Sequence, residues 1–117
     1  MIRIEKLTQS YCLNDINCTL PSGKLIGIMG ANGAGKSTLL KTIAGILPLK
    51  QGEVWFDNQP LSKMNATEKS HHIAYLAQNM QIHWDLSVYD VIALGLAATL
   101  PKEKERSKIQ AFSEKFA

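Results

Sequence analysis

One glycine-rich octapeptide constrains this chain more than any other feature. It fits the pattern GxxxxGK[ST] at every fixed position and reads Gly30-Ala31-Asn32-Gly33-Ala34-Gly35-Lys36-Ser37. Glycines in such a loop let the backbone adopt positive φ values and bring successive N–H groups against phosphate oxygens. The lysine adds a mobile charge for the β and γ phosphates, and the serine hydroxyl can bind Mg²⁺. The motif therefore predicts a phosphate loop that binds ATP or GTP.

The flanking sequence favours this interpretation over a chance glycine-rich turn. An apolar run at 25–29 follows a Pro-Ser-Gly turn and predicts a short buried strand that leads into the loop. After the loop, apolar residues recur at helical spacing from Leu39 to Leu47, and Pro48 is expected to stop the helix. A helix that begins at the loop aims its free N–H groups and positive dipole end at the same anion.

The remaining pattern predicts an α/β chain with an antiparallel β part. Strands are expected at 2–7, 16–20, 53–56 and 73–76. The first two can pair antiparallel, and Asp57-Asn58 predicts a hairpin that continues to Leu61. Further helices are expected at 65–70, after the capping-box-like pair Ser87 and Asp90, and from Pro101 onward.

Size and charge exclude few functions. The chain has 117 residues, 45% of them hydrophobic, which suits one modest soluble core. A net charge of +3 is too small to argue for a nucleic-acid partner. Cys12 and Cys18 lack metal-ligand spacing, and the start of the chain lacks an export or membrane-spanning segment. We therefore expect reduced thiols, a cytoplasmic setting and no direct membrane insertion.

Together these features resemble the N-terminal part of an ATP-binding-cassette (ABC) ATPase, the cytoplasmic motor subunit of ABC transporters. The resemblance rests on 16–20 with Pro21-Ser22-Gly23-Lys24, on 30–38, on 39–45, on Gly52-Glu53-Val54 and on Tyr75-Leu76-Ala77-Gln78. It implies an α/β P-loop NTPase fold of the ABC type, present in part. Residues 1–78 would form the nucleotide-binding core with its antiparallel β part, and residues 79–117 the start of a helical subdomain.

The resemblance also implies roles for individual residues, with ATP and Mg²⁺ as the ligands. Tyr11 would stack on the adenine ring, because a flat aromatic surface holds a purine without polar groups. Gln78 would reach Mg²⁺ and the attacking water, so that Lys36 and Gln78 are the catalytic candidates and Ser37 and Gln78 the metal ligands. The predicted phosphate-binding residues are Gly30, Asn32, Gly33, Ala34, Gly35, Lys36, Ser37 and Thr38.

In the complete protein the resemblance implies a dimer of ATP-binding subunits attached to transmembrane permease subunits at the inner face of the membrane. Apolar residues between Ile82 and Tyr89 could dock the permease or be buried in the helical subdomain. The segment 87–95 resembles importers of the iron-siderophore, haem or cobalamin type, although zinc and manganese importers share much of this pattern. No nucleic-acid partner is expected.

Hydrolysis in this family also uses an LSGGQ-type signature, a Walker B aspartate, an adjacent glutamate and a switch histidine, none of which occurs before Ala117. We therefore expect a truncated chain that binds nucleotide but hydrolyses it poorly or not at all, although the complete protein would be an ATPase. Two alternatives stay open. They are a soluble ABC ATPase that acts without a membrane partner and a non-catalytic nucleotide-binding fragment.

Overall fold

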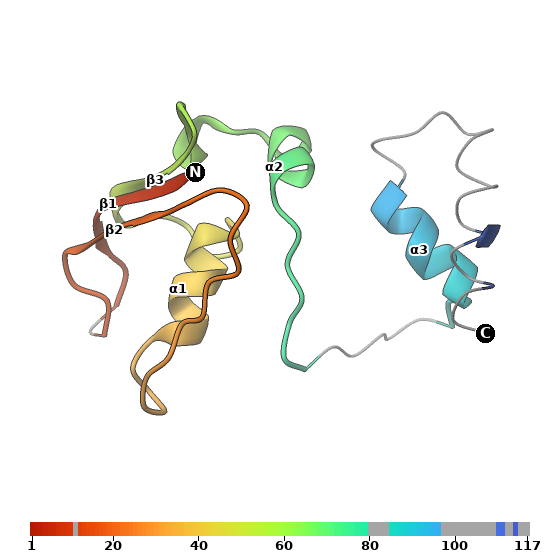
Figure 1. Cartoon of the computed structure of the whole chain (residues 1–117), viewed down its shortest axis with the longest axis horizontal. Helices are drawn as coiled ribbons and strands as arrows, with labels where there is room; N and C mark the ends of the chain where they lie inside the picture. The colour runs from red at the N-terminus through yellow and green to blue at the C-terminus, as the bar shows by residue number, and fades with distance from the viewer. Residues whose placement is uncertain (11, 80–84, 97–109, 112–113, 115–117) are drawn as a thin grey trace. The chain divides into compact units, whose positions relative to one another are not determined.

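The computed structural model describes residues 1–10, 12–79 and 85–96, together with Gln110, Ala111 and Glu114 (Figure 1). The chain divides into two units, Met1–Ala74 and Tyr75–Ala117. The first unit contains an antiparallel sheet and the glycine-rich loop, and the second contains one described helix.

A four-stranded sheet organises the first unit. Its order is β2-β1-β3-β4, and its strands are β1 (Ile2–Thr8), β2 (Ile16–Leu20), β3 (Gln51–Phe56) and β4 (Gln59–Pro60). Every pairing is antiparallel, with Ile4 opposite both Cys18 and Val54. The expected pairing of the first two strands and the expected hairpin at Asp57-Asn58 are thus confirmed.

The start of the chain is tied to this sheet. The Met1 ammonium donates to Asp57 Oδ1 at 2.9 Å and also to Ser22 Oγ. In return, the Asp57 N–H donates to the Met1 carbonyl at 2.9 Å. The first residue is therefore held between the β3–β4 turn and the segment that leads towards the glycine-rich loop.

A bulge interrupts β1 at Lys6. This residue has a φ of 50°, and the register shifts between Ile4 and Leu7 against β2 and between Glu5 and Thr8 against β3. Gly52 lies against the bulge with a φ of 87°, and a Cβ atom there would be 2.4 Å from the Lys6 carbonyl oxygen. Asn17 Oδ1 accepts the Lys6 N–H at 2.9 Å, which satisfies a donor that the bulge removes from the ladder.

The core of this unit lies between the sheet and α1 (Lys36–Ile43), with the 3-10 helix η1 (Leu61–Lys63) at its edge. Its buried apolar members are Ile4, Leu7, Ile43, Val54, Phe56, Leu61 and Met64. The helix ends earlier than expected. Gly45 takes a φ of 74° and donates its N–H to Thr42 O, so a left-handed glycine, not Pro48, terminates it.

Shortening Ile4 by one methyl group tests this core. Ile4 is 2% exposed, and we expect Ile4→Val to lower the free energy of unfolding by about 1 kcal/mol. Ile46→Val is the matched control, because Ile46 is 52% exposed and should change stability by less than about 0.5 kcal/mol. Urea unfolding followed by circular dichroism measures both, and equal effects would contradict this assignment of the core.

Two of the expected strands are wrong. Segments 25–29 and 73–76 are not strands in the structure. Leu25 is fully exposed, Met29 is 94% exposed and Leu76 is 81% exposed. A strand needs a hydrogen-bonded neighbour, and within the described sheet neither segment has one. Their apolar composition signals burial, but the described residues do not supply the surface that would bury them.

The shorter helices follow their capping signals. Asn65 and Glu68 form a reciprocal capping box at the start of α2 (Ala66–His72). Ser87 and Asp90 do the same for α3 (Val88–Leu96), where the Asp90 N–H donates to Ser87 Oγ at 3.1 Å. Of the helix expected from Pro101, the structure describes only Gln110, Ala111 and Glu114, which are helical.

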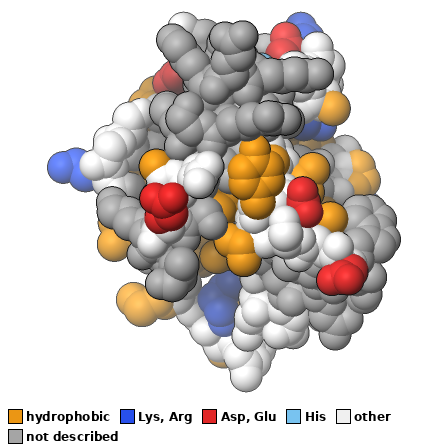
Figure 2. All heavy atoms as spheres, turned by 90° about the vertical axis from the view of Figure 1, so that its right-hand side faces the viewer, with side chains coloured by type: hydrophobic (Ala, Val, Ile, Leu, Met, Phe, Trp, Pro, Cys, Tyr) orange, Lys and Arg blue, Asp and Glu red, His pale blue; other side chains and the backbone are white. Residues whose placement is uncertain are grey.

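The described part of the second unit exposes apolar side chains on α3. Val88 is 64% exposed and Leu94 is 70% exposed, while Tyr89 and Val91 are less so. Figure 2 shows hydrophobic side chains grouped near the centre of the face that it draws. Among the helices that the structure describes, none combines the length and hydropathy needed to cross a bilayer.

Candidate functional site

The glycine-rich loop has the backbone that the motif predicts. Gly33 and Gly35 adopt φ values of 83° and 98°, which only glycine adopts without strain. Gly35 is also the N-cap of α1, and no side chain caps this helix end. The Leu39 N–H donates to Gly35 O at 2.8 Å, so the N–H groups of residues 36–38 precede the first intrahelical bond. The loop thus ends in free donors and the positive end of a helix dipole, which suits an anion.

Lys36 adds a positive charge inside the loop. Its Nζ atom donates to Gly30 O at 2.5 Å and to Ala31 O at 2.8 Å, so the side chain folds back across the loop. The first turn of α1 has no acidic residue that would neutralise this ammonium. Because carbonyls are neutral, they form no ion pair with the ammonium, and it can exchange them for phosphate oxygens.

The predicted phosphate-binding residues form one continuous surface segment. The loop from Gly30 to Ala34 is exposed, Gly35 and Lys36 are half-buried, and Ser37 at the first turn of α1 is exposed. Thr38 is half-buried, and its carbonyl accepts the Thr42 hydroxyl at 2.7 Å. An open loop with its donors on the surface can admit a polyphosphate from solvent.

The other two predicted site residues lie elsewhere. Tyr11 lies outside the described residues, so its adenine-stacking role stays a prediction. Gln78 is exposed and belongs to the second unit, whereas the loop belongs to the first. Its place beside Mg²⁺ therefore also stays a prediction.

One contact of the loop was not predicted from the sequence. Cys12 and Leu13 pack against Gly35, so that a Cβ atom at Gly35 would lie 2.9 Å from Cys12 Sγ and 3.1 Å from Leu13 Cδ2. Positions 12 and 35 are far apart in sequence, and Cys12 stands in no recognisable motif. No local pattern could have indicated that the β1–β2 connection closes over the loop.

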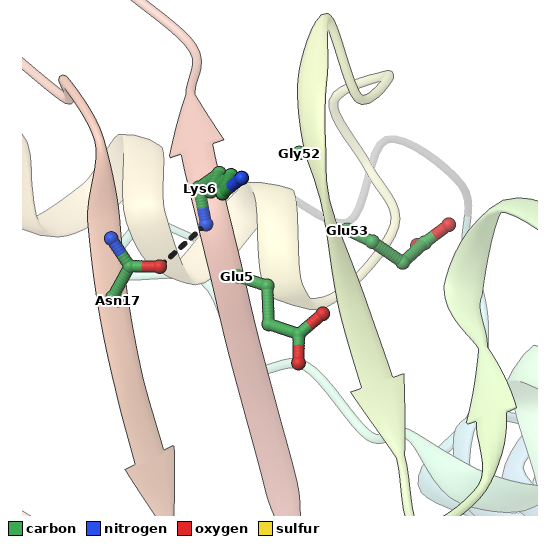
Figure 3. A pocket seen from close by; sticks show the side chains of 5 residues that line it. All are labelled: Glu5, Lys6, Asn17, Gly52 and Glu53. Atoms are coloured by element: carbon green, nitrogen blue, oxygen red, sulfur yellow. Dashed lines mark hydrogen bonds between the residues drawn. The ribbon is translucent and has the colours of Figure 1, made fainter.

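A separate depression of about 460 Å³ lies at the β1 bulge and is lined by Glu5, Lys6, Asn17, Gly52 and Glu53 (Figure 3). Both carboxylates that line it already bond other residues of the first unit. Glu5 accepts from Trp55 Nε1 at 3.1 Å, and its other oxygen lies 2.7 Å from Arg3 Nε. Glu53 accepts the Val54 N–H at 3.0 Å and bonds the Ser62 hydroxyl. These acids therefore hold strands and turns together.

Metal binding by protein side chains alone finds no support in the described residues. No group of three or more histidine, cysteine, aspartate and glutamate side chains there could enclose an ion. Cys12 and Cys18 are both free thiols.

Comparison with known proteins assigns residues 13–117 to a family model described as ABC transporter. The hemin import ATP-binding protein HmuV of Bordetella parapertussis is 42% identical over 83 residues, covering 71% of this chain and 32% of the relative. The zinc transport ATP-binding protein TroB of Treponema pallidum is 36% identical, covering 92% and 42%. The manganese transport ATP-binding protein MntB of Listeria innocua is 36% identical, covering 90% and 46%.

Solved structures show the same fold. A dimeric ATP-binding cassette, MJ0796, in a post-hydrolysis state with bound ADP and Pi matches with a TM-score of 0.78 and 23% identity. The match covers 95% of this chain and 55% of that one. The fold is thus that of an ABC ATPase cassette in part, as expected. The chain spans between about a third and a half of the length of the curated relatives described above.

Proposed function

We propose that this chain, which belongs to the ABC transporter family, binds ATP with Mg²⁺ through residues 30–38. The observation that carries the proposal is the loop geometry. Left-handed Gly33 and Gly35 lead directly into a helix end without a side-chain cap, and the Lys36 ammonium lies within the same loop. The family membership favours ATP over GTP.

Each part of the loop would have its own role. Backbone N–H groups from Gly33 to Thr38 would surround the phosphate oxygens. Lys36 would leave the carbonyls of Gly30 and Ala31 to contact the β and γ phosphates. Ser37, exposed at the first turn of α1, would offer its hydroxyl to Mg²⁺. Phosphoryl transfer in such a site depends mostly on positioning and on stabilisation of charge.

Calorimetric titration of the chain with Mg-ATP tests this binding. We expect saturable binding of one nucleotide per chain, with weaker binding when EDTA removes the Mg²⁺. AMP should bind much more weakly, because it lacks the phosphates that reach the loop and Lys36. Absence of saturable ATP binding by a folded chain would contradict the proposal.

For the complete protein we propose the energy-coupling ATPase subunit of an ABC importer. The support is that curated relatives carry names for hemin import, zinc transport and manganese transport. Partners would be transmembrane permease subunits and a second ATP-binding subunit, and the protein would lie at the inner face of the membrane. The dimeric form of the matching solved cassette agrees with the second partner.

Co-isolation distinguishes this function from the soluble alternative. Tagged protein recovered from detergent-solubilised membranes should bring a multi-span membrane protein with it. Ribosomal or DNA-bound material in its place would favour a soluble ABC ATPase. The exposed apolar side chains Val88 and Tyr89 on α3 are candidates for the docking surface, whereas Ile82 and Trp84 lie outside the described residues.

Gln78 is the proposed link between nucleotide and hydrolysis. In the complete protein assembled with its permease, Gln78→Ala should reduce the rate of ATP hydrolysis about a hundredfold, because the attacking water and Mg²⁺ lose a positioning oxygen. ATP affinity should change less than about threefold. Phosphate release measures the rate, and Asn79→Ala is the matched control because Asn79 is the exposed neighbour. Equal rates in the two variants would remove Gln78 from the site.

A further inference from the structure

The side chains of Cys12 and Leu13 lie so close to Gly35 that no side chain would fit at that position. A Cβ atom on Gly35 would be 2.9 Å from Cys12 Sγ and 3.1 Å from Leu13 Cδ2, both closer than ordinary van der Waals contact. Leu13 is 4% exposed, so this contact is part of the packed interior of the first unit. The close neighbours and the φ of 98° thus both require a glycine at position 35.

The residues that confine Gly35 are themselves anchored. The Gln9 N–H donates to Leu13 O at 3.0 Å, and the Leu13 N–H donates to Ser10 O at 3.2 Å. Gln9 is only 6% exposed, and its Oε1 accepts the Lys50 N–H at 3.3 Å, just before β3 begins. The connection between β1 and β2 is therefore closed on itself by two backbone hydrogen bonds and tied through Gln9 to the residue before β3.

Ser10 fixes the thiol that touches the loop. Its Oγ atom lies 2.9 Å from Cys12 Sγ and accepts the Cys12 N–H at 3.4 Å. A short hydroxyl–thiol contact restricts the rotation of the Cys12 side chain, which would otherwise be free to move away from Gly35. The Ser10 hydroxyl, the Cys12 thiol and Gly35 thus form one chain of contacts.

We propose that Cys12 and Leu13 are positioning residues for the phosphate loop. They hold Gly35 so that the N–H groups of residues 36–38 lie at the distance a bound polyphosphate requires. A displacement of these donors by less than an ångström weakens several charge-assisted hydrogen bonds at once. This role rests on the proposed binding of Mg-ATP at the loop. It means that the β1–β2 connection influences how tightly the loop binds the phosphates.

Enlarging the thiol tests the role. Cys12→Leu places a bulkier side chain against Gly35 and should raise the Kd for Mg-ATP about tenfold in calorimetric titrations of the full 117-residue chain. The Kd for inorganic tripolyphosphate should rise equally, because only the loop binds that ligand. Cys18→Leu is the matched control, since Cys18 is an exposed cysteine on β2, and its Kd values should equal those of the wild type.

The number of binding sites per chain distinguishes a positioning role from a loss of folded protein. A purely structural role would lower the number of binding sites per chain and leave the Kd of the remaining sites unchanged, which would overturn the proposal.

Ser10→Ala gives a second test that leaves the packing volume nearly intact, and it should raise the Kd about threefold. If Cys12→Leu fails to fold, an unchanged Kd in Ser10→Ala overturns the role. A folded wild type without ATP binding would overturn the proposed function, whereas normal wild-type binding with unaltered variants would overturn only this inference.

Discussion

Lys36→Ala should weaken binding of Mg-ATP about a hundredfold, because in the proposed binding mode it removes a charge-assisted hydrogen bond to the β and γ phosphates worth about 2–3 kcal/mol. The side chain already lies within the loop, where Nζ contacts Gly30 O and Ala31 O. Calorimetric titration of the folded variant measures the loss. AMP affinity should hardly change, since AMP lacks the β and γ phosphates that this ammonium is proposed to contact.

Lys41→Ala provides the control for that experiment. Lys41 is an exposed lysine of the same helix, beyond the loop, so this variant removes the same charge and the same methylene groups. Its Kd should remain within about twofold of the wild type. Equal Kd values for the two variants would show that Lys36 does not contact the nucleotide.

Gly52→Ala should lower the free energy of unfolding by about 3–5 kcal/mol, a large part of the stability of a small domain. The new Cβ atom would lie 2.4 Å from Lys6 O and 2.5 Å from Glu5 O. Both are backbone atoms of β1, an inner strand of the sheet, so neither can rotate away. The φ of 87° adds strain for any residue with a side chain.

Gly27→Ala is the matched change for this test. Nothing lies within 4 Å of a Cβ atom at Gly27, and its φ is not in the left-handed region. The variant should change stability by less than about 1 kcal/mol. Thermal unfolding followed by circular dichroism compares the two. Similar melting temperatures would mean that the β1 bulge does not require a glycine.

Local signals account for the parts of the fold that the sequence predicted. The alternation in β1 and β2, the Asp57-Asn58 turn and the capping pairs at Asn65 and Ser87 each act within a few residues. The apolar runs at 25–29 and 73–76 were different. Their composition indicates burial, but whether such a run becomes a strand depends on a distant neighbour, which hydrophobic pattern does not reveal.

The same distinction applies to the site. The backbone of the glycine-rich loop was predictable, because glycines at fixed spacing meet a local requirement, and Gly33 and Gly35 indeed adopt positive φ, whereas phosphate binding by its residues stays a prediction. The contact of Cys12 with Gly35 was not, because it depends on how the β1–β2 connection folds back over the loop. No sequence spacing marks a residue that contacts a motif from a distant part of the chain.

The tethering of Met1 bears on how this protein should be handled at the bench. Its ammonium donates to both Asp57 and Ser22. An affinity tag or fusion partner joined there would replace this charged group and its three N–H donors by an uncharged amide with one N–H. The added polypeptide would also emerge between the β3–β4 turn and the approach to the nucleotide loop. An affinity tag or fusion partner joined to Met1 is therefore expected to weaken this tether.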